Sequence, residues 1–154
     1  MNPMLKLSKK TDYAIILLTH LGEMHMPVSA QELSAHYRLP HPMTANILKQ
    51  LVTVGMTESV RGQHGGYVLA RPAEGVTLAE IVQVMDGPFT LVDCVHQEEG
   101  CKVSQCCPTR GALIALHRRM EQFMEETTLA SIIAESQLDL TSQPSQDHGT
   151  AHLS

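Results

Sequence analysis

Four cysteines lie close together in this 154-residue chain, at positions 94, 101, 106 and 107. Six residues separate Cys94 from Cys101, and five separate Cys101 from Cys107. Thiolates at this spacing on one loop can surround a single iron–sulfur cluster. Zinc sites usually carry paired C-x2-C motifs, which this chain lacks, so the spacing favours a cluster over zinc. Structural zinc, buried thiols and a thiol switch remain the alternatives, and His96 is a competing ligand inside the same loop.

The composition indicates a mainly α protein of the cytoplasm. Hydrophobic residues make up 43% of the chain, but only 3% are aromatic and none is Trp. Such a core rests on Leu, Ile, Val, Ala and Met, which suits helices packed on helices. No segment reaches the ~18 consecutive apolar residues that a membrane span needs, so no membrane partner is expected. In the reducing cytoplasm, clustered cysteines favour metal, cluster or redox chemistry over disulfides.

Charge is distributed unevenly along the chain. The net charge is −5, yet residues 1–71 carry seven Lys and Arg against four acids. The remainder carries four basic residues against twelve acids. The N-terminal half is therefore the half that a polyanion such as DNA would accept.

Three helices are expected in this basic half, over residues 8–22, 29–37 and 40–55. Ser8 and Ser29 are N-cap candidates for the first two helices. The prolines at the start of the third helix cost little, because the first turn leaves its N–H groups unpaired in any case. A short turn separates the second helix from the third, and this arrangement is the outline of a helix-turn-helix.

The third helix has two distinct faces at about 100° per residue. Its apolar face contains Thr44, Ile47, Leu48 and Leu51. Its opposite face contains Pro42, Ala45, Asn46 and Lys49. A small, amide-bearing and basic face is what a major groove would meet. An ordinary solvated surface is the alternative for Lys49, since lone exposed lysines are common.

Residues 60–69 predict two short strands around a glycine-rich turn. Arg61 lies at the start of this hairpin, and Tyr67 and Leu69 alternate inward. A hairpin that follows a helix-turn-helix is a wing.

Two helices are predicted downstream of the wing. A short helix capped by Thr77 comes first, and the cysteine loop follows it. A long helix then runs from residue 110 to about residue 126. Its apolar residues form one stripe at three- and four-residue steps: Leu113, Leu116, Met120, Phe123 and Met124. No second layer is left to cover this stripe, so we expect it to pack against a second copy in a two-fold dimer. A short capped segment over residues 128–133 follows.

These elements divide the chain into four parts. A winged helix-turn-helix DNA-binding domain covers 1–88, and a cluster-binding cysteine loop covers 89–109. A dimerisation helix region covers 110–136, and a polar tail over 137–154 is expected to be disordered.

These motifs together resemble the winged-helix iron–sulfur transcription regulators. That family includes the Isc and Suf operon regulators and the nitric-oxide-sensing repressor. The resemblance covers roughly residues 4–136, and the wing motif Arg61-Gly-x-x-Gly-Gly-Tyr-x-Leu69 is its most specific part. The segments 7–14, 59–67 and 107–111 are most similar to the Suf-type branch.

The resemblance implies a mainly α, winged helix-turn-helix fold with a long C-terminal dimerisation helix. It also implies that the third helix reads the major groove, while Arg61 of the wing enters the minor groove, where a guanidinium suits the negative potential. The DNA-contact candidates are His41, Asn46, Lys49 and Arg61.

The resemblance further implies a cluster held by three cysteines, and the family spacing into the long helix selects Cys107 over Cys106. Cys106 is then a spare thiol or an alternative ligand. Clusters usually need four ligands. The Isc branch has a histidine three residues after its last cysteine, where this chain has Arg110, which stays protonated and cannot ligate.

In the nitric-oxide-sensing branch, an acidic residue on the first helix of the other subunit completes the ligand set. Asp12 occupies the matching position in this chain. The alternative for Asp12 is a first-turn acid favoured by the helix dipole. The remaining histidines, including His20, His36 and His117, are expected to be ordinary surface or helix residues.

The function that the resemblance implies is a cytoplasmic, homodimeric transcription regulator, not an enzyme. It would bind a double-stranded operator, sense an iron–sulfur cluster, 2Fe–2S in preference to 4Fe–4S, and control Suf-type cluster-assembly genes. One alternative is a nitric-oxide- or thiol-redox-sensing repressor that uses the same cysteines. Another is an iron–sulfur carrier, which has no use for a wing or for the charge split.

Overall fold

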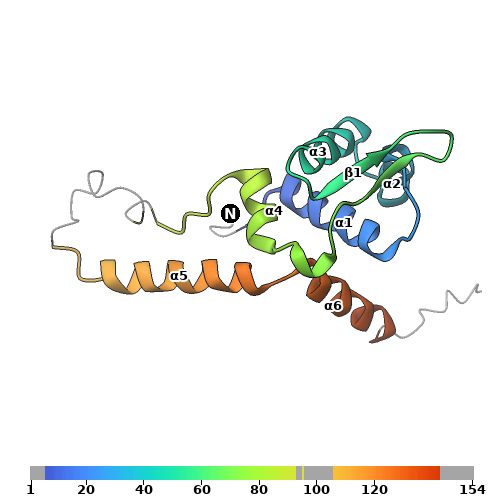
Figure 1. Ribbon diagram of the computed structural model, residues 1–154. Helices are drawn as coiled ribbons and strands as arrows, with labels where there is room; N and C mark the ends of the chain where they lie inside the picture. The colour runs from blue at the N-terminus through green and yellow to red at the C-terminus, as the bar shows by residue number, and fades with distance from the viewer. Residues whose placement is uncertain (1–5, 93–94, 96–105, 143–154) are drawn as a thin grey trace, which may run out of the picture.

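The computed structural model describes residues 6–92, 95 and 106–142 of the chain. The fold is mainly α with a two-stranded sheet, as predicted (Figure 1). Its elements in chain order are α1 (Lys9–Glu23), α2 (Ala30–Tyr37), α3 (His41–Thr53), β1 (Thr57–Val60), β2 (Gly66–Leu69), the 3-10 turn η1 (Ala73–Gly75), α4 (Leu78–Asp86), α5 (Arg110–Glu126) and α6 (Leu129–Ser142). No helix in this described part of the chain combines the length and the apolar character needed to cross a bilayer.

The core forms around α1, which packs against α3, α4, α6 and β2. Leu17 and Leu18 of α1 are fully buried. The apolar face predicted for α3 is confirmed, because its buried residues are Thr44, Ile47, Leu48 and Leu51. Burying one aliphatic side chain of this size stabilises the fold by about 1.5–3 kcal/mol. This shared core therefore fixes α3 in place and leaves its other face toward solvent.

The predicted caps set the starts of three helices. Ser8 caps α1, while Ser29 and Thr77 cap α2 and α4 in complete capping boxes. α2 ends at Tyr37, and its C-cap Arg38 adopts the left-handed conformation with φ of 53°. Pro40 then precedes α3, so a tight turn joins the two helices, as a helix-turn-helix requires.

The wing is an antiparallel pair of β1 and β2 that is tied to the helix-turn-helix. The Tyr67 N–H donates to the Val28 carbonyl at 2.8 Å, and the Val28 N–H donates to the Tyr67 carbonyl at 3.1 Å. At Gly66, a Cβ would lie 2.5 Å from the carbonyl carbon of Val28. At Gly65, a Cβ would overlap the Val60 carbonyl oxygen. The glycine pair of the wing motif is therefore a packing requirement.

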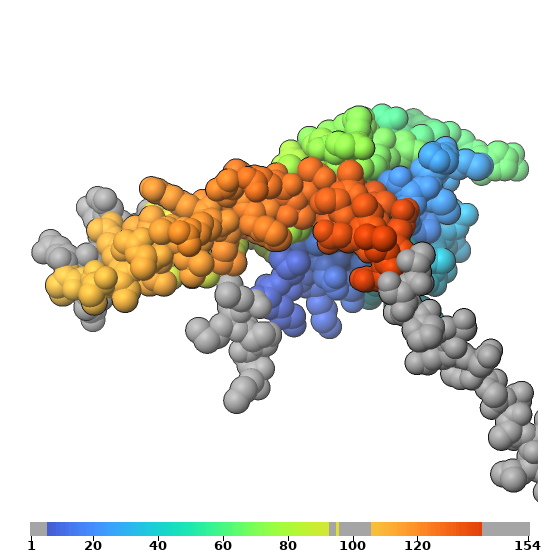
Figure 2. All heavy atoms as spheres, turned by 90° about the horizontal axis from the view of Figure 1, so that it is seen from below, coloured from blue at the N-terminus to red at the C-terminus, as the bar shows by residue number. Residues whose placement is uncertain are grey.

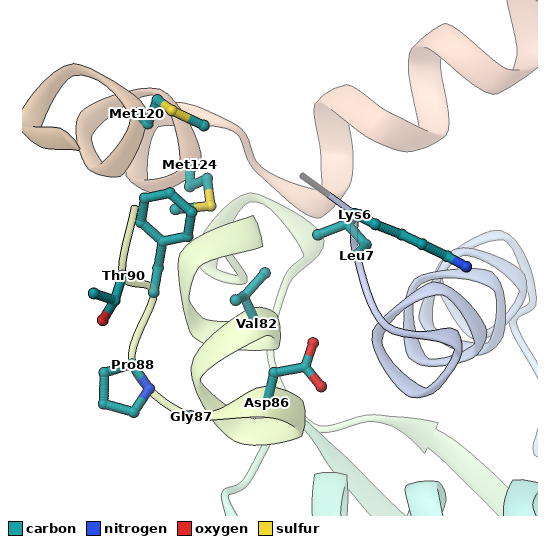
Figure 3. Close-up of a pocket in the computed structure, with 10 residues that line it drawn as sticks. Lys6, Leu7, Val82, Asp86, Gly87, Pro88, Thr90, Met120 and Met124 are labelled. Carbon is teal, nitrogen blue, oxygen red and sulfur yellow. The ribbon is translucent and has the colours of Figure 1, made fainter. Parts of the chain in front are cut away.

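The apolar stripe predicted for α5 is covered only in part by the same chain. Met120 and Met124 face the same chain and, with Val82 of α4, line a cavity of about 410 Å³ (Figure 3). Leu116 and Phe123 remain 46% and 65% exposed. α4 packs against part of α5, and Figure 2 shows that α5 extends well past the body of the protein.

α6 is longer than the segment predicted over residues 128–133. It continues to Ser142, past the boundary expected at residue 136 and into part of the expected tail. Leu129 is fully buried and Ile133 lies against Gly22 of α1, so the packing anchors the first turns. Ala, Glu, Gln and Leu then extend the helix because they are good helix formers. The rest of the expected tail, 143–154, lies outside the described residues.

The close approach of the wing to α2 predicts a specific sensitivity to a methyl group. Gly66→Ala should lower the free energy of unfolding by about 1–3 kcal/mol, because the new Cβ overlaps the backbone of Val28 and Ser29. Gly75→Ala is the control, since a Cβ there meets no atom within 4 Å. Urea denaturation followed by circular dichroism compares the two variants. Equal stability of both variants would contradict the packing described for the wing.

Candidate DNA interface and cysteine segment

The face of α3 opposite the core carries the predicted DNA contacts. Asn46 and Lys49 are exposed on this face, and His41 is exposed at the first position of α3. α3 contains no Asp or Glu, so no acid on this helix would repel a phosphate backbone. His41 Nδ1 also lies 3.3 Å from Ser34 Oγ, which joins the start of α3 to α2.

Arg61 is exposed directly after β1, at the start of the wing loop. The next residue, Gly62, has a φ of 120°, a conformation that favours glycine and turns the chain away from the strand. Figure 1 shows the loop of this hairpin extending beyond the helices. The guanidinium of Arg61 and the outer face of α3 are thus both accessible to a large ligand such as a duplex.

The cysteine segment is described only at its C-terminal end. The predicted ligands Cys94 and Cys101, and the competing His96, lie outside the described residues. Cys106 is exposed and Cys107 is half-buried, both directly before α5. Within the described part of the chain, no three His, Cys, Asp or Glu residues form a group that could hold a metal ion.

The thiol of Cys107 lies in a setting that favours its ionised form. Cys107 Sγ is 3.5 Å from Thr109 Oγ1. The hydrogen bond from this hydroxyl is the largest cause that lowers the pKa of the thiol, followed by the Thr109 backbone N–H. The backbone N–H and the charge of Arg110 act in the same direction. The thiolate is the form that ligates iron and other metals, so the chemistry of Cys107 fits a cluster ligand.

Asp12 is exposed in the first turn of α1. Asp12 does not lie beside Cys107 of the same chain. Figure 1 shows the start of α5, next to Cys107, well separated from α1. A ligand set that contains both residues therefore requires Asp12 from a second copy of the chain.

Asp86, which the sequence did not indicate, holds the start of α1 against the end of α4. The hydroxyls of Ser8 and Thr11 donate to its two carboxylate oxygens, each at 2.6 Å. Lys10 Nζ also donates to the Met85 carbonyl at 3.3 Å. Figure 3 shows the carboxylate pointing from α4 toward α1. Thr11 is fully buried and directly precedes Asp12, so this contact fixes the turn on which Asp12 lies.

The Asp86 carboxylate is ionised at neutral pH. Its partial burial alone would raise the pKa of this group. The hydrogen bonds from Ser8 and Thr11, together with the charge of Lys10, outweigh that effect and place the pKa below its ordinary value.

His117 lies on a helix, as one of the two expected alternatives had it, but it is buried and not at the surface. Its side chain is 1% exposed, and its ring stacks on Phe89 with the ring centroids 5.3 Å apart. The Leu91 N–H donates to its Nδ1 at 3.3 Å, and its Nε2 lies 3.1 Å from Glu121 Oε1. His117 thus holds the segment before the cysteines against α5. Its spacing from Met120 and Met124 along one face of α5 was the available sequence signal.

Comparison with known proteins places these features in a family. The sequence pattern of the Rrf2 family, described as iron-dependent transcriptional regulators, matches residues 7–135. The HTH-type transcriptional regulator CymR of Bacillus subtilis is 25% identical over 130 residues, covering 83% of this chain and 89% of that protein. The HTH-type transcriptional regulator NsrR of Shouchella clausii is 25% identical over 132 residues, covering 84% of this chain and 89% of that protein.

Solved structures share the fold. The structure of CymR, described as the global cysteine regulator of B. subtilis, aligns with a TM-score of 0.72 at 24% identity and covers 85% of this chain and 98% of its own. That of T. potens IscR aligns with a TM-score of 0.71 at 23% identity and covers 91% of this chain and 94% of its own. These similarities confirm the winged-helix fold that was predicted from the sequence.

The setting of Cys107 predicts how its reactivity depends on pH. Thr109→Val removes the hydroxyl beside the thiolate and should move the pKa of Cys107 upward, toward its ordinary value. The substitution should leave the start of α5 unchanged, because the Thr109 side chain makes no capping hydrogen bond. In reduced, cluster-free protein, the midpoint of the pH–rate profile for alkylation of Cys107 by iodoacetamide should rise, as measured by mass spectrometry. The control is Thr90→Val, at an exposed position, and the same midpoint in both variants would rule out the role of the hydroxyl.

Proposed function

The chain belongs to the Rrf2 family of transcriptional regulators, and we propose that an iron–sulfur cluster sets its affinity for operator DNA. Its relatives CymR and NsrR are named HTH-type transcriptional regulators, and this function is regulatory and not enzymatic. The observation that carries the proposal is the position of the Cys107 thiol directly before α5, 3.5 Å from Thr109 Oγ1, in a segment with two further cysteines at cluster spacing.

We propose Cys94, Cys101 and Cys107 as the three thiolate ligands. Of the two adjacent cysteines, Cys107 has Thr109 and the start of α5 beside it to stabilise a thiolate. When bound, the cluster would supply a redox- and iron-sensitive group, 2Fe–2S in preference to 4Fe–4S. The protein's part is to hold the thiolates ionised and to place the segment against α5 through His117.

Asp12 of a second subunit is the proposed fourth ligand. Its exposure, and its separation from Cys107 within one chain, support a role across a dimer. A carboxylate is a harder and weaker ligand for cluster iron than a thiolate, so one iron would be easier to attack or release. That lability suits a sensor.

The exposed apolar residues of α5 support the homodimer. Leu116 and Phe123 leave 46% and 65% of their surfaces exposed on a helix that extends past the body. Pairing α5 with its copy around a two-fold axis would cover them and would place two reading heads on a palindromic duplex.

His41, Asn46, Lys49 and Arg61 are the proposed DNA contacts. All four side chains are exposed, and the N-terminal half that carries them has a basic excess. We propose that the regulated genes include those for Suf-type cluster assembly, so that a loaded regulator reports sufficiency.

A thiol-redox-sensing repressor is the second candidate function. A thiol with a lowered pKa, such as that of the half-buried Cys107, is more open to oxidation than an ordinary thiol. The same cysteine segment would then switch by oxidation without holding iron.

Bound iron distinguishes these candidates. Protein purified without oxygen should absorb visible light and contain iron and sulfide, and Cys107→Ala should remove all three signals because a ligand is lost. Cys106→Ala is the matched control at the adjacent position and should keep them. A colourless wild-type protein that contains zinc would exclude the cluster, and a loss only in Cys106→Ala would reassign the third ligand.

Operator binding tests the wing. The probe is a duplex that the wild-type protein has enriched from a random DNA pool. Arg61→Ala should weaken binding to this duplex about tenfold, because a guanidinium is removed from the minor groove. Gln63→Ala, at an exposed position in the same loop, is the control and should bind almost as the wild type does. Fluorescence anisotropy over a range of salt concentrations measures both variants. If Arg61→Ala binds as tightly as Gln63→Ala, the wing does not contact the DNA as proposed.

A further inference from the structure

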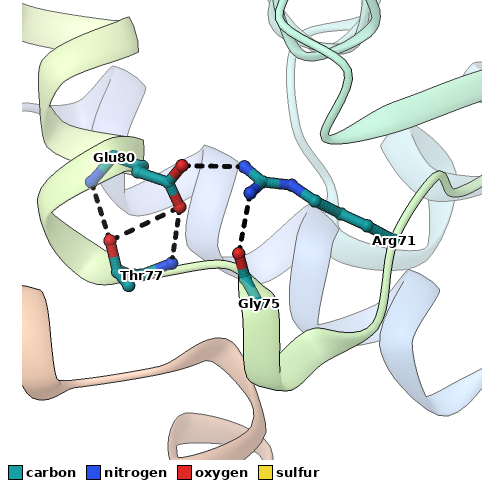
Figure 4. A network of polar contacts seen from close by, with 4 residues as sticks. All are labelled: Arg71, Gly75, Thr77 and Glu80. Atoms are coloured by element: carbon teal, nitrogen blue, oxygen red, sulfur yellow. Dashed lines mark hydrogen bonds and ion pairs between the residues drawn. The ribbon is translucent and has the colours of Figure 1, made fainter.

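Arg71 ties the end of the wing to the first turn of α4. Its Nη1 donates to the Gly75 carbonyl at 2.7 Å, and its Nη2 donates to Glu80 Oε1 at 3.0 Å. The other oxygen of Glu80 accepts from the Thr77 N–H at 3.0 Å, within the capping box. Figure 4 shows the guanidinium reaching from the segment after β2 to these groups. One carboxylate thus both caps α4 and holds the wing.

The same turn of α4 also holds the C-terminal end of α5. The Leu78 N–H donates to the Thr127 carbonyl at 2.8 Å, and the Leu129 N–H donates to the Val76 carbonyl at 2.8 Å. The start of α4 is therefore the point where the wing meets the link between α5 and α6.

The opposite end of α4 is bonded to the turn of α1 that carries Asp12, the proposed fourth ligand. Asp86 holds the start of α1, and the chain continues through Gly87 and Pro88 toward the cysteines. α4 has nine residues and is about 14 Å long. Its buried side chains are Ile81, Val82 and Met85. A helix of this length that is bonded at both ends is able to shift as one body, as packed helices do in shear motions.

We propose that α4 transmits the state of the cysteine segment to the wing, with Arg71 and Glu80 as the positioning residues. This inference rests on the proposed function, since it names the path by which a cluster would act on DNA binding. A displacement at Pro88 or at the start of α1 shifts α4, and the Arg71–Glu80 pair then moves the wing with it. The direction of Arg61 toward the duplex changes as a result.

The exposure of the pair separates this role from a structural one. The side chains of Arg71 and Glu80 are 35% and 41% exposed, so water screens the ion pair and its contribution to folding stability is small. Its geometry is nevertheless defined, because two donors of one planar guanidinium are both engaged. Removing the pair should therefore change communication between the sites far more than it changes stability.

The test measures a coupling factor, which is the ratio of duplex affinities of the cluster-loaded and cluster-free protein. The probe is the duplex enriched by the wild-type protein. Arg71→Gln and Glu80→Gln should each reduce this factor by at least about fivefold. If the wild-type factor is itself smaller than about five, each change should bring it to one, the value without coupling. The double variant should reduce it no further, because both changes remove the same contact. Gln retains the capping role of Glu80, so α4 keeps its start.

Glu74→Gln is the matched control, an exposed acid on the neighbouring turn η1, and should keep the wild-type factor. Thermal unfolding should show all variants folded. A wild-type factor of one would overturn the proposed function itself. A normal wild-type factor that persists in Arg71→Gln and Glu80→Gln would overturn the role of α4 alone. Equal weakening in both states, with the factor kept, would show that the pair only places the wing, and would likewise overturn the inference.

Discussion

The carboxylate of Asp86 is the interaction on which the arrangement of the domain depends. It joins two helix ends that are far apart in the sequence, since Ser8 and Thr11 of α1 both donate to it. α1 is the helix around which the core forms, and α4 leads directly to the cysteine segment. Hydrogen bonds to an ionised acceptor are roughly twice as strong as neutral ones. Because the pKa of Asp86 lies below its ordinary value, the contact persists at neutral pH and is lost only when the carboxyl is protonated in strong acid.

Local features of the sequence predicted most of the N-terminal half. The caps at Ser8, Ser29 and Thr77 and the buried face of α3 follow from short-range hydrogen bonding and from helical periodicity. The wing motif was also predicted from the sequence. The structure explains its two glycines, because a Cβ at Gly66 would overlap Val28 and one at Gly65 would overlap the Val60 carbonyl oxygen. Each of these signals lies within a few residues of the feature that it specifies.

What the sequence did not reveal depends on contacts between distant residues. Asp86 and Arg71 bond to partners on other elements, and no local pattern identifies those partners. The burial of His117 depends on its ring contact with Phe89 and on the hydrogen bond from the Leu91 N–H, both from a segment distant in the sequence. The uneven burial of the apolar residues on α5 likewise depends on which of them α4 reaches. Cys94 and Cys101 remain predictions from their spacing, while Cys107 gains support from the groups around it.

The central claim is that the cluster, rather than the protein fold alone, sets operator affinity. The most direct measurement is the anaerobic titration of one wild-type preparation with its enriched duplex, before and after the cluster is removed, with anisotropy as the readout. We expect the two dissociation constants to differ by at least about fivefold, and reconstitution of the cluster to restore the first value. Identical dissociation constants in the loaded and cluster-free states would contradict the claim.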